Sequence, residues 1–252
     1  MGLIDSHCHL YSLSNVEDAV LHARDAGVTK VLVVSEDLET MEQTLRLRDD
    51  FPGFVLPSLG IHPVNVLCMS QNEWEKTFSF LRSHANESSC IGEIGLDYKY
   101  ATTEEEKERQ SRALHAQMEV AAENHLPVNL HSRRALRQTM AEAIAFHKDT
   151  GLPAMLHWFA HSRKLLRRTN EEGIFVSVGP SILFCEDALN LAFAIDPKLI
   201  LVETDTPVPF KGKPSCPAWV AEVAENLITN HPEKGLTKER LSDNALQYLK
   251  KL

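Results

Sequence analysis

Leu3-Ile4-Asp5-Ser6-His7-Cys8-His9 stands near the start of this 252-residue chain and has the pattern of a buried β-strand that ends in polar residues. His7 and His9 are two residues apart, so strand alternation directs both side chains to one face, with Asp5 below them and Cys8 on the opposite face. No glycine-rich phosphate loop follows this strand, as it would in a dinucleotide-binding open sheet. The stretch therefore favours a barrel strand that carries reactive groups at its end.

The same alternation of strand and helix continues along the chain. Seven further strands are expected at residues 30–34, 54–61, 90–95, 127–131, 154–157, 174–178 and 199–203. Helices are expected at residues 15–25, 38–49, 72–84, 104–124, 135–148, 162–169, 186–194, 217–229 and 238–249. Strict alternation predicts a parallel sheet, and eight strands favour an α/β (β/α)₈ TIM barrel that forms a single domain over residues 1–252. An open doubly wound sheet is the alternative.

Composition and charge exclude several classes of protein. The formal charge of -9 excludes the broad basic footprint that binding of long duplexes requires. The five cysteines are odd in number and scattered, which indicates neither a disulfide framework nor a zinc ribbon and fits a reducing compartment. The chain shows no basic and apolar leader and no apolar run of about 20 residues. We expect a cytoplasmic protein without membrane or obligate protein partners.

Active sites of (β/α)₈ barrels lie at the carboxyl ends of the strands, and several histidines of this chain fall there. His7 and His9 end the first strand, where two imidazoles facing the barrel axis suit a divalent metal. A pair of hydrogen-bonded core histidines is the alternative. Cys8, which faces away, is expected to be an unreactive core residue.

Glu93 is a carboxylate inside the otherwise apolar strand Ile91-Gly92-Glu93-Ile94-Gly95. Burying an unpaired carboxylate is costly, so Glu93 requires a cation or strong donors. A salt bridge to a barrel arginine is the alternative to a position between two metals, where a glutamate gives one oxygen to each.

Three more strand ends carry residues that complete such a centre. His131 and His157 end the fifth and sixth strands and, together with Glu93, form a plausible second metal position. Asp205 closes the eighth strand and is expected to meet His7 and His9, because the first and last strands of a closed barrel are neighbours.

Five segments of the chain, in order, resemble the motifs of the TatD-type metal-dependent deoxyribonucleases, which are amidohydrolase-like (β/α)₈ barrels. They are Asp5-Ser6-His7-Cys8-His9, Gly60-Ile61-His62-Pro63, Gly92-Glu93-Ile94-Gly95-Leu96-Asp97, Pro127-Val128-Asn129-Leu130-His131-Ser132-Arg133 and Glu203-Thr204-Asp205-Thr206-Pro207. The resemblance implies that His7, His9, Glu93 and Asp205 surround one metal and that Glu93, His131 and His157 hold the second. The chain departs from the family pattern after His157, where His161 replaces a glycine, and this affects substrate preference.

The resemblance implies a hydrolase that cleaves DNA phosphodiester bonds with two divalent cations, which could be Zn, Mg or Mn. Asp205 and Glu93 are the expected catalytic residues, with Asp205 accepting a proton from the attacking water. His62, Arg133 and His161 are the expected substrate-binding residues. A structural role beside Pro63 is the alternative for His62, and a solvated residue at a helix start is the alternative for Arg133. The substrate would be single-stranded DNA, a DNA end or a small phosphoester.

Two other functions fit parts of the sequence. An amidohydrolase-type lactonase, amidase or phosphotriesterase would use a similar barrel, although many such enzymes bridge their metals with a modified lysine at the place of Glu93. A catalytically inactive metal-binding barrel is the second alternative.

The basic residues after the fifth and sixth strands could steer a DNA strand or form a solvated helix face; they are Arg134, Arg137, Arg163, Lys164, Arg167 and Arg168.

Overall fold

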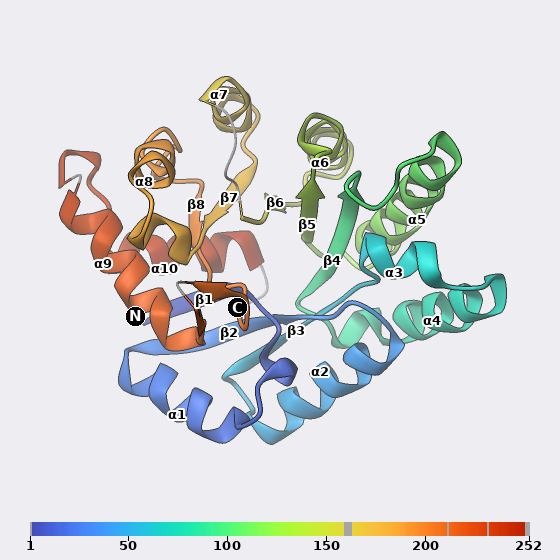
Figure 1. The fold of residues 1–252 in the computed structure, drawn as a ribbon, viewed down its shortest axis with the longest axis horizontal. Coiled ribbons are helices and arrows are strands. Elements are labelled where there is room, and N and C mark those ends of the chain that lie inside the picture. Colours follow the sequence, from blue (N-terminus) through green and yellow to red (C-terminus); the bar gives the residue numbers. More distant parts are fainter. Residues whose placement is uncertain (1, 159–162, 211, 231, 250–252) are drawn as a thin grey trace.

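The computed structural model describes residues 2–158, 163–210, 212–230 and 232–249. Eight parallel strands form one sheet in the order of the chain, and helices surround it (Figure 1). The strands are β1 (Leu3–Cys8), β2 (Val28–Val34), β3 (Val55–Leu59), β4 (Cys90–Asp97), β5 (Val128–Arg133), β6 (Ala154–Leu156), β7 (Phe175–Val178) and β8 (Ile200–Val202). The expected (β/α)₈ barrel is confirmed, and the open doubly wound sheet is excluded.

The longer helices lie close to the expected ranges. They are α1 (Val16–Asp25), α2 (Leu38–Asp50), α4 (Gln71–His84), α5 (Glu104–Glu123), α6 (Leu136–Thr150), α7 (Arg163–Glu171), α8 (Glu186–Ala192), α9 (Val220–Asn230) and α10 (Lys238–Leu249). Several begin at a side-chain cap: Asp37, Ser70 and Thr103 each close a capping box at the start of α2, α4 and α5. None of the helices in the described ranges is long and apolar enough to cross a bilayer.

Short elements in the loops were not expected from the sequence. The helix α3 (Pro63–Cys68) follows β3, with His62 as its N-cap. After β8, the two-residue strands β9 (Pro209–Phe210) and β10 (Lys213–Pro214) pair as an antiparallel hairpin. Both elements lie in loops at the carboxyl ends of the strands, where loops build the functional site of a barrel.

The barrel closes where β1 meets the segment that follows β8. At the junction of β1 with the segment after β8, the Asp205 N–H donates to the His7 carbonyl (2.9 Å) and the His9 N–H donates to the Thr206 carbonyl (2.8 Å). Asp5 accepts hydrogen bonds from both the N–H and the hydroxyl of Thr204. These bonds place the carboxyl ends of the first and eighth strands side by side, as expected for Asp205.

The opposite end of the barrel is filled by apolar side chains. Ile4, Leu32, Leu56, Cys90, Met155, Phe175 and Leu201 come from seven of the eight strands and pack with α10. Tyr248 of α10 is fully buried there, and its hydroxyl contacts the Cys90 thiol at 3.1 Å and donates to the Val128 carbonyl at 3.0 Å. Because apolar side chains close this end, the interior of the barrel is accessible only from the end that carries the polar residues.

Candidate metal centre

Glu93 lies at the middle of the polar end of the barrel, with 2% of its surface exposed. The glycines beside it allow β4 and β5 to approach closely. A Cβ atom on Gly95 would lie 2.1 Å from the His131 carbonyl oxygen, and one on Gly92 would lie 2.6 Å from the Asn129 Cβ. Only glycine fits these two positions, and their close approach brings Glu93 against His131.

One carboxylate oxygen of Glu93 faces the first strand. Glu93 Oε2 lies 3.7 Å from His7 Nε2 and 3.5 Å from His9 Nε2. Asp205 Oδ1 lies 3.6 Å and 3.4 Å from the same two nitrogens. The structure thus brings together the four residues expected around one metal.

The other oxygen of Glu93 faces β5 and β6. Glu93 Oε1 lies 2.7 Å from His131 Nδ1 and 2.8 Å from His157 Nε2, with His62 Nε2 more distant at 3.8 Å. These residues form the second expected group. No arginine or lysine of the described residues lies within ion-pair distance of Glu93, so the alternative of an arginine salt bridge is wrong for this part of the chain.

The far nitrogens of the first two histidines have partners of their own. His7 Nδ1 lies 3.0 Å from Asn129 Oδ1, and His9 Nδ1 lies 2.8 Å from the Tyr11 hydroxyl. The Tyr11 hydroxyl donates to Glu36 Oε2 at 3.3 Å. An amide oxygen can only accept, so His7 carries its proton on Nδ1 and presents the Nε2 lone pair to Glu93 and Asp205.

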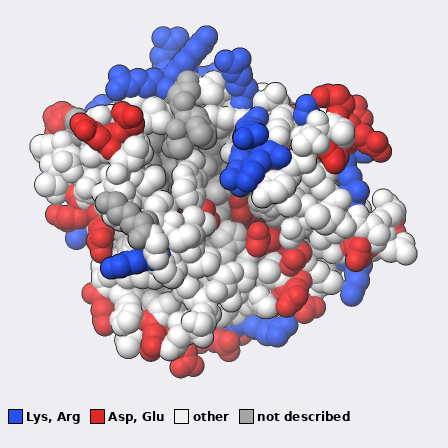
Figure 2. Space-filling model, in the orientation of Figure 1, with Lys and Arg blue, Asp and Glu red and all other residues white. Residues whose placement is uncertain are grey.

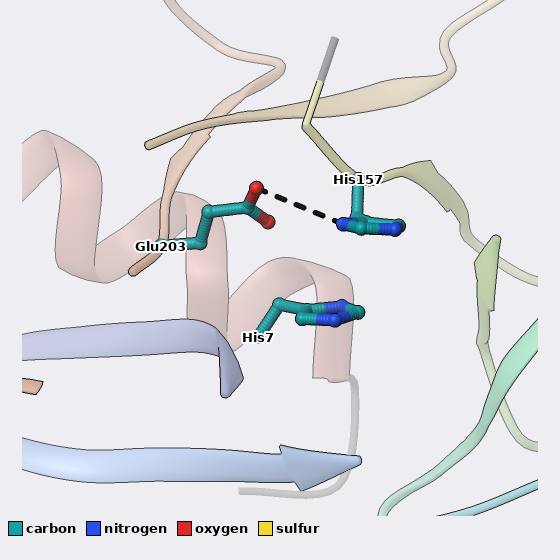
Figure 3. A group of neighbouring side chains, drawn as sticks. All are labelled: His7, His157 and Glu203. Atoms are coloured by element: carbon teal, nitrogen blue, oxygen red, sulfur yellow. Dashed lines mark ion pairs between the residues drawn. The ribbon is translucent and has the colours of Figure 1, made fainter. Parts of the chain in front are cut away.

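A carboxylate lies behind each of the two other histidines. His131 Nε2 lies 3.1 Å from Asp97 Oδ2, so that its Nδ1 is directed at Glu93. His157 Nδ1 lies 3.8 Å from Glu203 Oε1, which is too far for a hydrogen bond. The ring of His157 lies over that of His7 (Figure 3). The two rings stack with their centroids 3.9 Å apart. Partners behind a ligating histidine fix its orientation and raise its basicity.

Burial and neighbouring charges can shift the pKa values of these side chains in opposite directions. Burial, together with His157, lowers the pKa of His7 to about 3, so this imidazole is neutral at pH 7. Burial alone would raise the pKa of Glu93, but the surrounding histidines lower it well below its usual range. Glu93 is therefore an anion that requires cations or donors around it.

The residues fit a divalent metal. His7 Nε2 is buried and has no hydrogen-bond partner, which is costly for a polar atom unless a ligand completes it. Ligand atoms of His7, His9 and Glu93 lie within 4.8 Å of one another, as do those of His62, Glu93 and His131. Imidazoles and carboxylates with this arrangement are the donor set of zinc, manganese and related ions.

A family comparison agrees with this geometry. The model of the family described as TatD related DNase matches residues 4–251. The chain belongs to that family. The expected identification as a TatD-like metal-dependent hydrolase is thereby confirmed.

Relatives and solved structures of this TatD-family protein cover nearly all of it. Human "Deoxyribonuclease TATDN3" is 29% identical, over 100% of this chain and 96% of its own length. "Uncharacterized metal-dependent hydrolase YcfH" of Escherichia coli strain K12 is 31% identical, over 96% and 92%. The crystal structure of YJJV, a TatD homologue from Escherichia coli K12, superimposes with a TM-score of 0.83 at 25% identity, covering 98% of this chain and 97% of that one.

The three expected substrate-binding residues of this TatD-family chain differ in their placement. His62 lies beside the centre, and its Nδ1 accepts from the Val64 N–H, so the proton is on the Nε2 that faces Glu93. Arg133 ends β5, is exposed, and lines a cavity of about 350 Å³ together with His131, His157 and Asp205. His161 lies outside the described residues.

The partners behind these histidines were not expected from the sequence. Asn129 and Asp97 lie within the motifs that suggested the family, but the residue pattern alone gave them no role. Tyr11 lies in the short 3-10 helix Leu10–Ser12 and Glu36 in the loop after β2, both outside those motifs. A polar residue two positions before His131, inside an apolar strand, was the available signal for Asn129.

Proposed function

We propose that this TatD-family protein is a deoxyribonuclease that cleaves DNA phosphodiester bonds with a binuclear divalent metal centre. The observation that carries the proposal is the position of Glu93, whose two oxygens face two separate groups of imidazoles. One metal would be held by His7, His9, Glu93 and Asp205, and the other by Glu93, His131 and His157. Such cations supply Lewis-acid stabilisation of phosphate charge and acidify bound water.

The remaining chemistry belongs to side chains around the centre. Asp205 Oδ1 faces His7 and His9, whereas Oδ2 makes no hydrogen bond within the described part of the chain and is placed to accept a proton from the attacking water. Burial lowers the pKa of His62 to about 4, so His62 is a neutral Nε2–H donor for a phosphate oxygen. Arg133 offers paired guanidinium donors at the rim of the same cavity.

A basic groove beside the centre fits a single strand or a DNA end. The groove has a volume of about 1220 Å³ and shares Arg133 with the cavity at the centre. Its other basic residues are Lys99, Arg134, Arg137, Lys164, Arg167 and Arg168. Figure 2 shows lysines and arginines gathered over α7 and beside the central hollow, while acidic residues occupy much of the remaining rim. This local charge, rather than the net charge of -9, would attract the phosphates.

The proposal is tested by metal content and by one substitution. Elemental analysis of the purified protein gives the bound metal, and treatment with EDTA should abolish cleavage of single-stranded DNA until a divalent cation is restored. Asp205→Asn keeps the size of the side chain but removes the proton acceptor, so cleavage should fall by roughly a hundredfold or more. Asp196→Asn, at a loop outside the centre, is the matched control and should cleave at the wild-type rate.

Three outcomes would contradict the proposal. An Asp205→Asn variant with full nuclease activity would remove the assigned role of Asp205. Hydrolysis of lactones without cleavage of any DNA would favour the amidohydrolase alternative. A protein that binds metal and cleaves neither class of substrate would be an inactive metal-binding barrel.

A further inference from the structure

Four aromatic side chains form a continuous surface next to the metal centre, and no step of the proposed reaction uses them. They are Trp158, Phe184, Phe210 and Trp219, hereafter the aromatic platform. Trp158 follows β6, Phe184 follows β7, Phe210 lies on β9, and Trp219 ends the short 3-10 helix before α9. All four therefore lie in the connections that follow β6, β7 and β8, at the end of the barrel that carries the centre.

The rings of the aromatic platform contact one another, and each is at least partly exposed. Trp158 and Phe210 stack with centroids 5.5 Å apart and an interplanar angle of 24°. Phe210 in turn lies 6.2 Å from Phe184 and 6.4 Å from Trp219. None of the four is buried, and Phe184 is 41% exposed. Partly exposed aromatic side chains that lie together beside a polar site are a common mark of a binding surface.

Trp158 is held in place by the residues that support the centre. Its backbone N–H donates to Glu203 Oε1 (2.9 Å), the oxygen that faces His157, and to Ser177 Oγ (3.1 Å). Its backbone is left-handed, with φ of 44°, a conformation that costs energy for a bulky residue and recurs at ligand sites. The indole lines the 350 Å³ cavity together with His131, His157 and Asp205.

The aromatic platform and the basic groove adjoin the same cavity. Trp158 belongs to the lining of the cavity, and Arg133 belongs to both the cavity and the groove. Aromatic stacking surface next to a groove that attracts phosphates is the arrangement with which proteins bind unpaired nucleotides. A base within a duplex hides both faces in the stack, so only an unpaired or terminal base can lie on such rings.

We propose that the aromatic platform is a stacking site for an unpaired nucleobase of DNA whose phosphate lies at the metal centre. The inference rests on the proposed function and names its substrate as single-stranded or frayed DNA. Because every base presents a π face, the site accepts all four bases. It binds DNA that carries bases more tightly than abasic DNA.

Binding without metal tests the inference independently of cleavage. In EDTA, fluorescence anisotropy compares a labelled thymidine oligonucleotide with an abasic oligonucleotide of equal length, which carries the same phosphate charge. The wild type should bind the thymidine strand roughly fivefold more tightly or better, since stacking of one base contributes at least about that factor. Binding of the thymidine strand should also quench tryptophan fluorescence, because two of the three tryptophans lie in the platform.

Matched variants separate stacking from folding. Phe210→Leu keeps an apolar side chain but removes the ring, and should lose the preference for thymidine over abasic DNA, whereas Phe210→Tyr should keep it. Phe78→Leu is the control, because Phe78 is also half-buried and also stacks on a tryptophan, Trp74, but lies on α4 away from the site. Equal binding of both strands by the wild type, or a retained preference in Phe210→Leu, would overturn the inference.

Failure of the inference is distinguishable from failure of the proposed function. Cleavage of the thymidine strand with metal, without any preference over abasic DNA in binding, would leave the nuclease intact and remove the stacking site. A preference in binding without cleavage under any metal would leave the stacking site and remove the nuclease. Concentration-dependent self-association abolished by Phe210→Leu, without any preference for bases, would make a second copy of this chain the occupant and would also overturn the inference.

Discussion

Asp97 is the residue whose position behind His131 has the clearest experimental consequence. It accepts from His131 Nε2 through Oδ2 and from the Lys99 N–H through Oδ1. Asparagine offers only one acceptor oxygen to these two donors, so Asp97→Asn should weaken metal binding about 10- to 100-fold, as other losses behind a metal ligand do. Titration of the metal-free protein, followed by calorimetry, measures the change.

A control variant keeps this prediction specific. Asp49→Asn replaces an exposed aspartate that pairs with Arg48 on the outer surface, and its metal affinity should equal that of the wild type. Unchanged affinity in Asp97→Asn would show that His131 is oriented by packing against His62 and not by the carboxylate.

The five cysteines should differ sharply in reactivity. Burial raises the pKa of the Cys90 thiol to about 12 and that of Cys8 well above its usual range, and both side chains are fully buried. Only the thiolate reacts, so alkylation of the native protein near pH 8 should modify the exposed Cys68 and Cys185 and spare these two. Mass spectrometry of peptides reads the pattern, and rapid modification of Cys8 in the folded protein would contradict its placement.

At the scale of elements, the helix α10 stabilises the barrel through Tyr248. Tyr248→Phe removes a hydroxyl that contacts Cys90 and Val128, which should lower the free energy of unfolding by about 1 kcal/mol. Tyr248→Ala also leaves a cavity and should lower it by about 3–5 kcal/mol. Urea denaturation measures both, and Leu21→Ala, at a position that is 55% exposed, should change stability by less than about 0.5 kcal/mol.

Elements with strong periodicity were predictable from the sequence, whereas elements that depend on distant contacts were not. All eight strands were found because each is a short apolar run bounded by loops and helices. The helix α3 was missed because its six residues are too few to show a periodic pattern, and His62, expected at a strand end, caps this helix instead. The hairpin of β9 and β10 has only two residues in each strand and no alternation to detect.

The candidate centre followed from the sequence in part. Strand ends converge in a barrel, so His7, His9, Glu93, His131, His157 and Asp205 could be placed together without a structure. Their supporting partners could not, because Asn129 reaches His7 across 122 positions of the chain and spacing reveals nothing about such a contact.

At the scale of the whole molecule, the basic groove of this acidic protein should give DNA binding a specific dependence on salt concentration. Each phosphate contact on a single strand contributes about 0.7 to the slope of log affinity against log salt concentration. Arg137→Gln, in the groove, should therefore reduce the slope for single-stranded DNA by about 0.7. Arg46→Gln removes an exposed arginine that pairs with Glu42 on α2 and should leave the slope unchanged. If the two variants had the same slope, the DNA would not lie in the basic groove.

The closure of the barrel has a consequence for biosynthesis. His7 and His9 leave the ribosome early, but Asp205 follows only after about 200 more residues have been translated, and Tyr248 after about 240. Until then the first strand is paired with β2 but lacks the eighth strand on its other side, so its two imidazoles lie at a solvent-exposed sheet edge. Nascent chains stalled before Asp205 would therefore lack one of the proposed metal ligands. Complete metal binding would then occur only after almost the whole barrel has been translated.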